Sequence, residues 1–201
     1  MLAQQLRPAV ADERVLAAIA SIPRERFVAP GERRLAYENI ALPIACGQTI
    51  SQPLVVARML ETLELRSTDR VLDIGTGSGY HAALLALLSE HVWTVERHAE
   101  LTEQARQALD ALGIDNVTYA VDDGWNGLPS EAPFDAINVA AAIGGDVPVA
   151  LQEQLADGGR LVVPVGATEQ HLIMIRRTAA GLVPTQLEAV RFVPLVRDSD
   201  G

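Results

Sequence analysis

The 201-residue sequence contains a single cysteine, Cys46, and no long uncharged hydrophobic run. One cysteine cannot form a disulfide within the chain, which suits a reducing compartment. The longest apolar run, 82–88, is much shorter than the roughly 20 residues that cross a bilayer. The N-terminal residues lack the basic segment and apolar run of a signal peptide. We therefore predict a cytoplasmic protein.

Basic residues are also few, with 16 Lys and Arg against 26 Asp and Glu, which gives a formal net charge of −10. Such a surface repels nucleic-acid backbones and anionic membranes, so neither is an expected partner. Hydrophobic residues make up 49% of the chain and charged residues 21%, which excludes a disordered protein. The length fits one domain, and we expect that domain, 1–201, to be a monomer.

The hydrophobic pattern separates an N-terminal helical region, 1–66, from a region of alternating strands and helices, 67–201. In the first region, Asp12 can cap a helix that ends at Pro23, and a second helix is expected to begin at Pro53. In the second region, the strands are predicted at 70–74, 91–96, 116–121, 134–139 and 160–165, and the helices at 80–89, 98–112 and 147–155. We predict an α/β, Rossmann-like, doubly wound and mostly parallel sheet with helices on both faces.

The last part of the chain breaks this alternation. Strands are predicted at 171–176 and 189–193, and the stretch between them is rich in turn residues near Gly181 and Pro184. We expect these two strands to add to the C-terminal edge of the sheet in antiparallel orientation.

A glycine-rich loop, DIGTGSG, runs from Asp73 to Gly79, between a predicted strand and its helix. Ligands of open parallel sheets bind at the carboxyl ends of the strands, where this loop lies. The dinucleotide fingerprint GxGxxG would have glycine where Tyr80 stands. A carboxylate such as Asp73 suits a cationic ligand better than a pyrophosphate. These two features favour S-adenosylmethionine, which carries a sulfonium and an ammonium group, over NAD.

Acidic residues follow the next two predicted strands. Glu96 ends one strand and can accept hydrogen bonds from ribose hydroxyls. Asp122 and Asp123 follow the other, and only one of them should face the pocket because neighbours on an extended chain point in opposite directions. We choose Asp123, with Gly124 allowing close approach to the adenine. Each feature alone fits an ordinary turn, but together they form the pattern of one nucleoside pocket.

Several segments resemble the protein-L-isoaspartate O-methyltransferase family. The segment 71–80, VLDIGTGSGY, is similar to the first motif of the family. The segment 42–53, in which LPI is followed by GQTISQP, is particular to this family among methyltransferases of the same fold. The resemblance spans roughly 15–196 in the family's order, with further similar segments at 22–28, 36–37, 133–137, 158–166 and 190–195.

The resemblance implies methylation of the α-carboxylate of L-isoaspartyl residues in aged proteins and peptides, with S-adenosylmethionine as cofactor. Ser51 matches the family's active-site serine, and Thr49 lies beside it. Spacing alone favours a capping role for both in the following helix. The implied cofactor-binding residues are Gln48, Thr49, Ile50, Ser51, Asp73, Gly75, Thr76, Gly77, Ser78, Gly79, Glu96, Arg97, Asp123 and Gly124. The implied substrate-binding residues are Ser51, Val163, Pro164, Val165 and Gly166, and no metal ligand is expected.

The sequence leaves three alternatives. The segment 140–145, AAAIGG, replaces a family stretch that usually carries threonine and proline, which motivates the first: a methyltransferase acting on a small-molecule or peptide natural-product carboxylate. A non-catalytic cofactor-binding module is the second alternative, and a dehydrogenase, disfavoured by Tyr80 and Asp73, is the third. Among the remaining residues, we expect Cys46 to be a buried thiol and His81 to be a solvated helix residue; Trp125 either covers the adenine or fills its loop.

Overall fold

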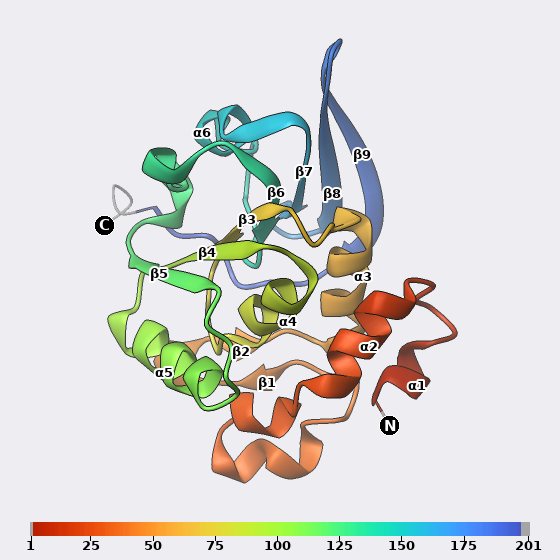
Figure 1. Ribbon diagram of the computed structural model, residues 1–201, viewed down its shortest axis with the longest axis vertical. Helices are drawn as coiled ribbons and strands as arrows, with labels where there is room; N and C mark the ends of the chain where they lie inside the picture. The colour runs from red at the N-terminus through yellow and green to blue at the C-terminus, as the bar shows by residue number, and fades with distance from the viewer. Residues whose placement is uncertain (1, 198–201) are drawn as a thin grey trace.

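The computed structural model describes residues 2–197, which contain a seven-stranded sheet flanked by helices (Figure 1). The first five strands in sequence pair in parallel, and the last two pair antiparallel at one edge. This confirms the predicted fold class. In sheet order the strands are β5 (Val117–Val121), β4 (His91–Glu96), β3 (Arg70–Ile74), β6 (Phe134–Val139), β7 (Leu155–Val165), β8 (Gln170–Thr178) and β9 (Gly181–Val190).

The central strands are apolar on both faces because both faces are covered. Alternate residues enter two separate cores: Val71 and Val162 pack into the first, whereas Leu72 and Val163 pack into the second. Near-continuous apolar runs of this kind are typical of parallel strands buried on both sides.

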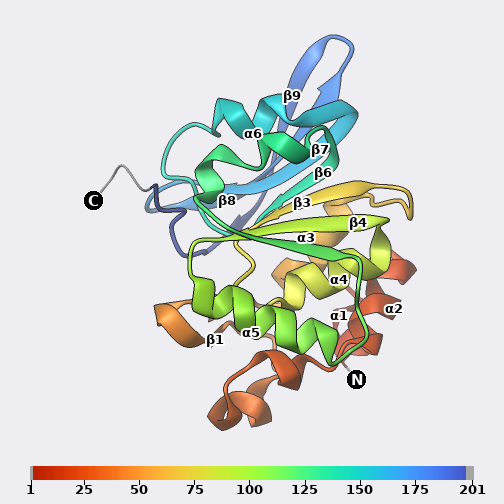
Figure 2. The ribbon, with the colours of Figure 1, turned by 60° about the vertical axis from the view of Figure 1, so that its left-hand side comes forward.

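The helices cover the two faces unequally (Figure 2). The first core packs against α1 (Leu2–Leu6), α2 (Glu13–Ser21), α3 (Pro53–Leu63), α4 (Tyr80–Leu88) and α5 (Ala99–Asp110), whereas the second receives Leu151 of the short α6 (Val149–Glu153). The predicted helix at 147–155 was too long. Leu155 already pairs with Phe134 and begins β7, so the strand starts before the glycine pair that was predicted to precede it and before its predicted start at Arg160.

The C-terminal hairpin is longer than predicted and extends beyond the rest of the sheet (Figure 1). Its turn joins Thr178 to Gly181, whose φ is +116°. Pro184 lies inside β9 rather than in the turn, which an edge strand tolerates because no partner needs its missing N–H. The predicted strand at 189–193 was wrong beyond Val190, where the chain leaves the sheet.

The N-terminal region contains short elements in addition to α1–α3. Asp12 caps α2 as predicted, because its carboxylate accepts from the backbone N–H of Arg14 at 2.8 Å. A two-stranded ribbon, β1 (Leu42–Pro43) with β2 (Thr49–Ile50), precedes α3. The 3-10 helices of the chain are η1 (Arg24–Phe27), η2 (Pro30–Leu35), η3 (Ala45–Gly47), η4 (Gly124–Asn126) and η5 (Pro129–Glu131).

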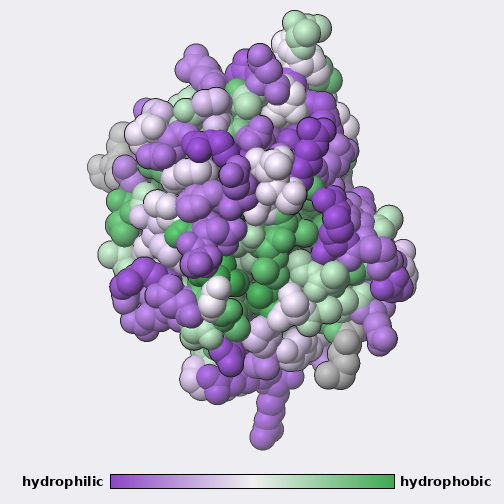
Figure 3. Space-filling view, viewed as in Figure 1, coloured by the Kyte–Doolittle hydropathy of each residue, from purple (hydrophilic) through white to green (hydrophobic). Residues whose placement is uncertain are grey.

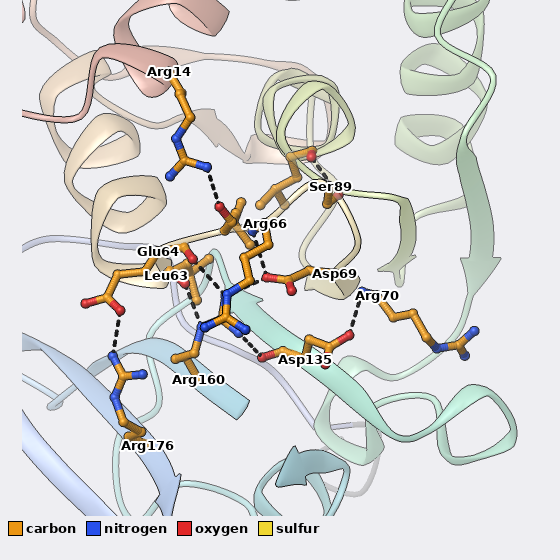
Figure 4. A network of polar contacts seen from close by, with 12 residues as sticks. Arg14, Leu63, Glu64, Arg66, Asp69, Arg70, Ser89, Asp135, Arg160 and Arg176 are labelled. Atoms are coloured by element: carbon orange, nitrogen blue, oxygen red, sulfur yellow. Dashed lines mark hydrogen bonds and ion pairs between the residues drawn. The ribbon is translucent and has the colours of Figure 1, made fainter. Parts of the chain in front are cut away.

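A buried arginine joins this region to the sheet (Figure 4). The guanidinium of Arg160, on β7, donates to the carbonyls of Leu63 (2.8 Å) and Glu64 (3.0 Å) at the C-terminal end of α3. It also pairs with the carboxylate of Asp69 at 2.5 Å and donates to the carbonyl of Asp135 at 3.0 Å. Carbonyls at a helix end lack partners within the helix and carry partial negative charge, so a cation satisfies them well.

The surface seen from the direction of Figure 1 is mostly hydrophilic, with hydrophobic residues gathered near its centre, over α4 (Figure 3). Leu87 of α4 is 48% exposed, although most of that helix is buried. Within residues 2–197, the structure contains no helix long and apolar enough to span a membrane.

Candidate active site

A cavity of about 340 Å³ lies at the carboxyl ends of β3 and β4, between the glycine loop and the segment before α3. Its volume lies at the lower end of the range of ligand sites, about 300–1,000 Å³. Most of the predicted cofactor-binding residues line it: Gln48, Thr49, Ile50, Ser51, Gly75, Thr76, Gly77, Ser78, Glu96, Arg97 and Gly124. Three others, Asp73, Gly79 and Asp123, are not part of the cavity wall.

The glycine loop turns sharply because Gly75, Gly77 and Gly79 all adopt positive φ, at +91°, +53° and +87°. Only glycine does so without steric cost. Gly75 and Gly77 thereby present backbone to the cavity. Gly79 serves helix packing instead of the cavity wall, since a Cβ there would come within 2.8 Å of the Cβ of Ala105 on α5.

Asp73 lies behind the cavity wall, fully buried at the end of β3. Its carboxylate accepts from Thr94 Oγ1 at 2.9 Å and from Asn138 Nδ2 at 2.8 Å. Thr94 Oγ1 in turn lies 2.6 Å from Oγ1 of Thr76, so Asp73 supports the loop through Thr94. Burial raises the pKa of Asp73 to about 6, although its two hydrogen bonds lower it. Asp73 therefore acts on a ligand in the cavity through its charge and its support of the loop, not by contact.

Glu96 reaches the cavity wall, and the backbone fixes its carboxylate. The two carboxylate oxygens accept from the N–H groups of Gly77 and His98, each at 3.0 Å. A carboxylate offers about four acceptor positions, so both oxygens can still accept hydrogen bonds from hydroxyl groups. This geometry suits the two neighbouring hydroxyls of a ribose.

The acidic pair after β5 is arranged as predicted only in part. Asp122 is exposed and Asp123 is buried, but Asp123 caps η4 by accepting from the N–H of Trp125 at 2.9 Å. Gly124 lines the cavity, and a Cβ there would lie 2.5 Å from Cγ2 of Ile74. Trp125 packs against the second core and does not line the cavity, so it fills its loop.

Thr49 and Ser51 line the cavity and do not cap α3. The N-cap residue of α3 is Gln52, which makes no side-chain cap hydrogen bond. Instead, the N–H of Leu54 in the first turn donates to Oδ1 of Asn39 at 3.0 Å. The capping interpretation was therefore wrong, and neither hydroxyl is used as a cap of α3.

Arg24, on η1, holds the Ser51 segment from behind. It is fully buried and donates to the carbonyls of Ser51 (2.8 Å) and Ala36 (2.9 Å). Its guanidinium lies 4.8 Å from the ring centroid of Tyr80, and burial lowers its pKa to about 10. Nothing in the local sequence indicated this role, since Arg24 lies 27 residues from Ser51.

Two minor predictions about the cavity were wrong. His81 is 6% exposed and lies on the cavity wall. Burial, with a smaller effect of Arg24, lowers the pKa of His81 to about 3, so it is a neutral imidazole. Cys46 is exposed at the cavity, in a left-handed conformation with φ of 55°. The residue pattern could not reveal either position, because both depend on how the N-terminal region folds over the sheet.

The C-terminal segment 193–196 closes the cavity from a side that sequence reasoning missed. The carbonyl of Val193 accepts from the N–H of Ala142, and the N–H of Leu195 donates to the carbonyl of Ala142, both at 2.8 Å. This places the unusual segment 140–145 beside the cavity. None of the predicted substrate residues 163–166 lines this cavity, and Gly166 lines a separate one.

The chain matches the family model of protein-L-isoaspartate(D-aspartate) O-methyltransferase over residues 1–200. It belongs to this family. Curated relatives named protein-L-isoaspartate O-methyltransferase come from Serratia proteamaculans (53% identity, 98% of this chain and 94% of the relative) and Koribacter versatilis (52%, 98% and 89%). The resemblance seen in the sequence is thereby confirmed.

Solved structures of the family agree. A protein-L-isoaspartate O-methyltransferase superposes with a TM-score of 0.88 at 29% identity, over 98% of this chain and 65% of its own. A putative one from Plasmodium falciparum, in complex with S-adenosyl-L-homocysteine, gives 0.85 at 26% identity, over 97% and 96%. Membership of an O-methyltransferase family decides against a dehydrogenase and against a non-catalytic module. Within residues 2–197, no cluster of three or more His, Cys, Asp or Glu side chains could hold a metal ion.

Proposed function

We propose that this chain transfers the methyl group of S-adenosylmethionine to the α-carboxylate of L-isoaspartyl residues in aged proteins and peptides, as a protein-repair methyltransferase. One observation carries the proposal beyond family membership. The cofactor cavity shares Thr49, Ser51, Ala140 and Val193 with a second cavity of about 740 Å³. A methyl donor on one side and a substrate carboxylate on the other would therefore meet at the hydroxyls of Thr49 and Ser51.

The residues present fit the cofactor. Glu96 would bind the ribose hydroxyls, the glycine loop presents backbone at Gly75 and Gly77, and Gly124 leaves room for the adenine. Asp73 supplies negative charge beneath a cationic ligand, and Asp123 and Gly79 hold the surrounding turns. The complex of the Plasmodium relative with S-adenosyl-L-homocysteine supports the same choice.

When bound, S-adenosylmethionine would supply a methyl group on a sulfonium. A carboxylate oxygen would bond to that methyl carbon as its bond to sulfur breaks, leaving S-adenosylhomocysteine, with no proton transfer. A carboxyl group with an ordinary pKa of about 4 is already ionised at neutral pH, so the chain needs no general base. Ser51 and Thr49 would donate to the carboxylate and orient it, and Arg24 holds the Ser51 backbone in place. Alignment of two reacting groups in this way can lower the activation free energy by about 7–11 kcal/mol. Exclusion of water by the bound substrate would further favour a reaction in which opposite charges cancel.

We also propose that 1–201 acts as one domain, in which 1–66 covers the site and 67–201 binds the cofactor. The first core supports this, because it combines α1–α3 with strands of the sheet. Cytoplasmic location, a monomeric state and the absence of nucleic-acid or membrane partners belong to the same proposal, and the net charge of −10 supports the last of these. Small-molecule carboxylates are the less favoured substrates, since the curated relatives align over nearly the whole chain.

Replacing Ser51 by alanine tests the site. Loss of one hydrogen bond to a charged group costs about 1.5–3 kcal/mol, so Ser51→Ala should lower kcat/KM for an isoaspartyl peptide roughly 10- to 150-fold. Calorimetry should show binding of S-adenosylhomocysteine close to that of the wild type. The matched control is Ser130→Ala, an exposed serine on η5 outside the cavities, which should keep full activity. Wild-type turnover by Ser51→Ala would remove Ser51 from the mechanism.

A further inference from the structure

The second cavity, called here the middle cavity, continues toward the surface. It shares residues 189–192 with a third, outer cavity of about 970 Å³. The outer cavity is bounded by the loop after β7, which includes Gly166 and Glu169, and by the start of β8 at His171. The middle and outer cavities, which meet along 189–192, are together called the groove, and Ser51 lines its inner part.

The groove is lined by few ionisable side chains. Within the described residues, Arg191 is the only ionisable side chain that lines the middle cavity, and it also lines the outer one. The outer cavity adds Glu169 and His171. Arg191 therefore gives the middle cavity a positive charge on a protein whose net charge is −10.

The backbone around Arg191 is fixed, although the side chain is exposed. Val190 pairs with Gln170 in the last register position of the hairpin. The side chain of Gln170 then holds both backbone groups of Phe192: Oε1 accepts from its N–H at 2.6 Å, and Nε2 donates to its carbonyl at 3.2 Å. Val193 is tied to Ala142. Within the part of the chain that the structure describes, the Arg191 guanidinium forms no ion pair. Its backbone is held at the groove, and its exposed side chain is available to a ligand there.

We propose that Arg191 determines substrate specificity by pairing with an acidic side chain next to the isoaspartyl residue. The proposal rests on the proposed function. The reacting carboxylate must lie where the cofactor and middle cavities meet, at Thr49 and Ser51. Arg191 lines the middle cavity but not the cofactor cavity, so it contacts the substrate away from the reacting group. The enzyme therefore favours isoaspartyl sites with Asp or Glu nearby over sites with Lys or Arg.

The test compares isoaspartyl peptides that carry Asp, Asn or Lys at the positions flanking the isoaspartate. Methyl ester formation gives kcat/KM for each peptide with wild type, Arg191→Gln and Arg191→Glu. Exposed ion pairs are weak, so the wild type should prefer the Asp peptide over the Lys peptide roughly 2- to 5-fold, chiefly through KM. Because salt screens exposed charges, 0.5 M salt should reduce this ratio toward one.

Arg191→Gln should bring the ratio near one at low salt, and Arg191→Glu should reverse it. The matched control is Arg34→Gln, which makes the same charge change at an exposed residue of η2 outside the groove and should keep the wild-type ratio. An unchanged ratio in both Arg191 variants, or an equal change in Arg34→Gln, would overturn the proposal while leaving the proposed function intact. If the wild type methylated none of the peptides, the proposed function itself would fail.

Discussion

Asp73 is a fully buried carboxylate beside the cofactor cavity, and burial raises its pKa to about 6 from an ordinary value of 3.8. A raised pKa in the folded state means that the folded chain binds this proton more tightly than the unfolded chain. The protonated Asp73 therefore adds its full contribution to the free energy of unfolding below about pH 4, and this contribution is lost as the pH rises through 6. Near neutral pH, ionisation of the buried Asp73 lowers the stability of the fold. In the proposed function, the same charge lies near a cationic cofactor.

Asp73→Asn should remove this pH dependence while preserving the shape of the site. Relative to wild type, the variant should gain stability between pH 4 and 7, by up to about 3 kcal/mol at 1.36 kcal/mol per pKa unit. Urea unfolding at several pH values and fixed ionic strength measures the difference. Asp115→Asn, at an exposed position, is the control and should show no such trend. Parallel stability curves for wild type and Asp73→Asn would contradict the assigned pKa.

Single residues were only partly predictable. Alternation along an extended chain predicted that Asp123, and not Asp122, faces the pocket; Asp123 is indeed the buried one, but it caps η4 and does not line the cavity. The position of Cys46 depends on a left-handed turn for which the local sequence gave no signal. Contacts between segments distant in the sequence determine where these side chains lie, whereas hydrophobic periodicity indicates only the local secondary structure.

At the scale of elements, the link between α3 and the sheet depends on the guanidinium of Arg160 (Figure 4). Its partners come from the end of α3 and from β6, together with Asp69 just before β3. Breaking a buried ion pair by removing one member leaves the other charge unpaired. The same bonds hold the N-terminal region, which carries Thr49 and Ser51, over the cofactor cavity.

Arg160→Met should lower the free energy of unfolding by about 3–5 kcal/mol, because Asp69 and the carbonyls would lose their partner. Arg176→Met is a matched control in the neighbouring strand. Arg176 pairs at 3.0 Å with Glu64, whose side chain is 66% exposed, so its loss should cost less than about 1 kcal/mol. Chemical denaturation at pH 7 compares the two variants. If both variants lost the same small amount of unfolding free energy, the Arg160 network would contribute little to stability.

The alternation of apolar segments predicted most elements of the sheet, since each parallel strand is buried on both faces. The errors fall where that signal is weak. The glycine pair before Arg160 looked like a turn, but β7 passes through it with a register shift. Pro184 looked like part of a turn, but it lies in an edge strand.

At the scale of the whole molecule, function depends on segments that meet only in the folded chain. The cofactor cavity combines residues from the segment before α3, the ends of β3 and β4, and the C-terminal segment 193–196. The glycine loop and Glu96 could be predicted because they follow successive strands. The C-terminal closure could not, because 193–196 follow an antiparallel hairpin and carry no chemical signature of their own.

We infer that the methyl donor and an isoaspartyl carboxylate meet at Thr49 and Ser51, which line both the cofactor cavity and the middle cavity. Labelled S-adenosylmethionine with paired peptides that differ only in an isoaspartyl or a normal aspartyl linkage at one position tests this directly. We expect a labelled methyl ester on the isoaspartyl peptide and essentially none on its aspartyl partner. Equal labelling of both peptides, or labelling of neither by an enzyme that binds S-adenosylhomocysteine, would exclude isoaspartyl methylation as the function and indicate another carboxylate substrate.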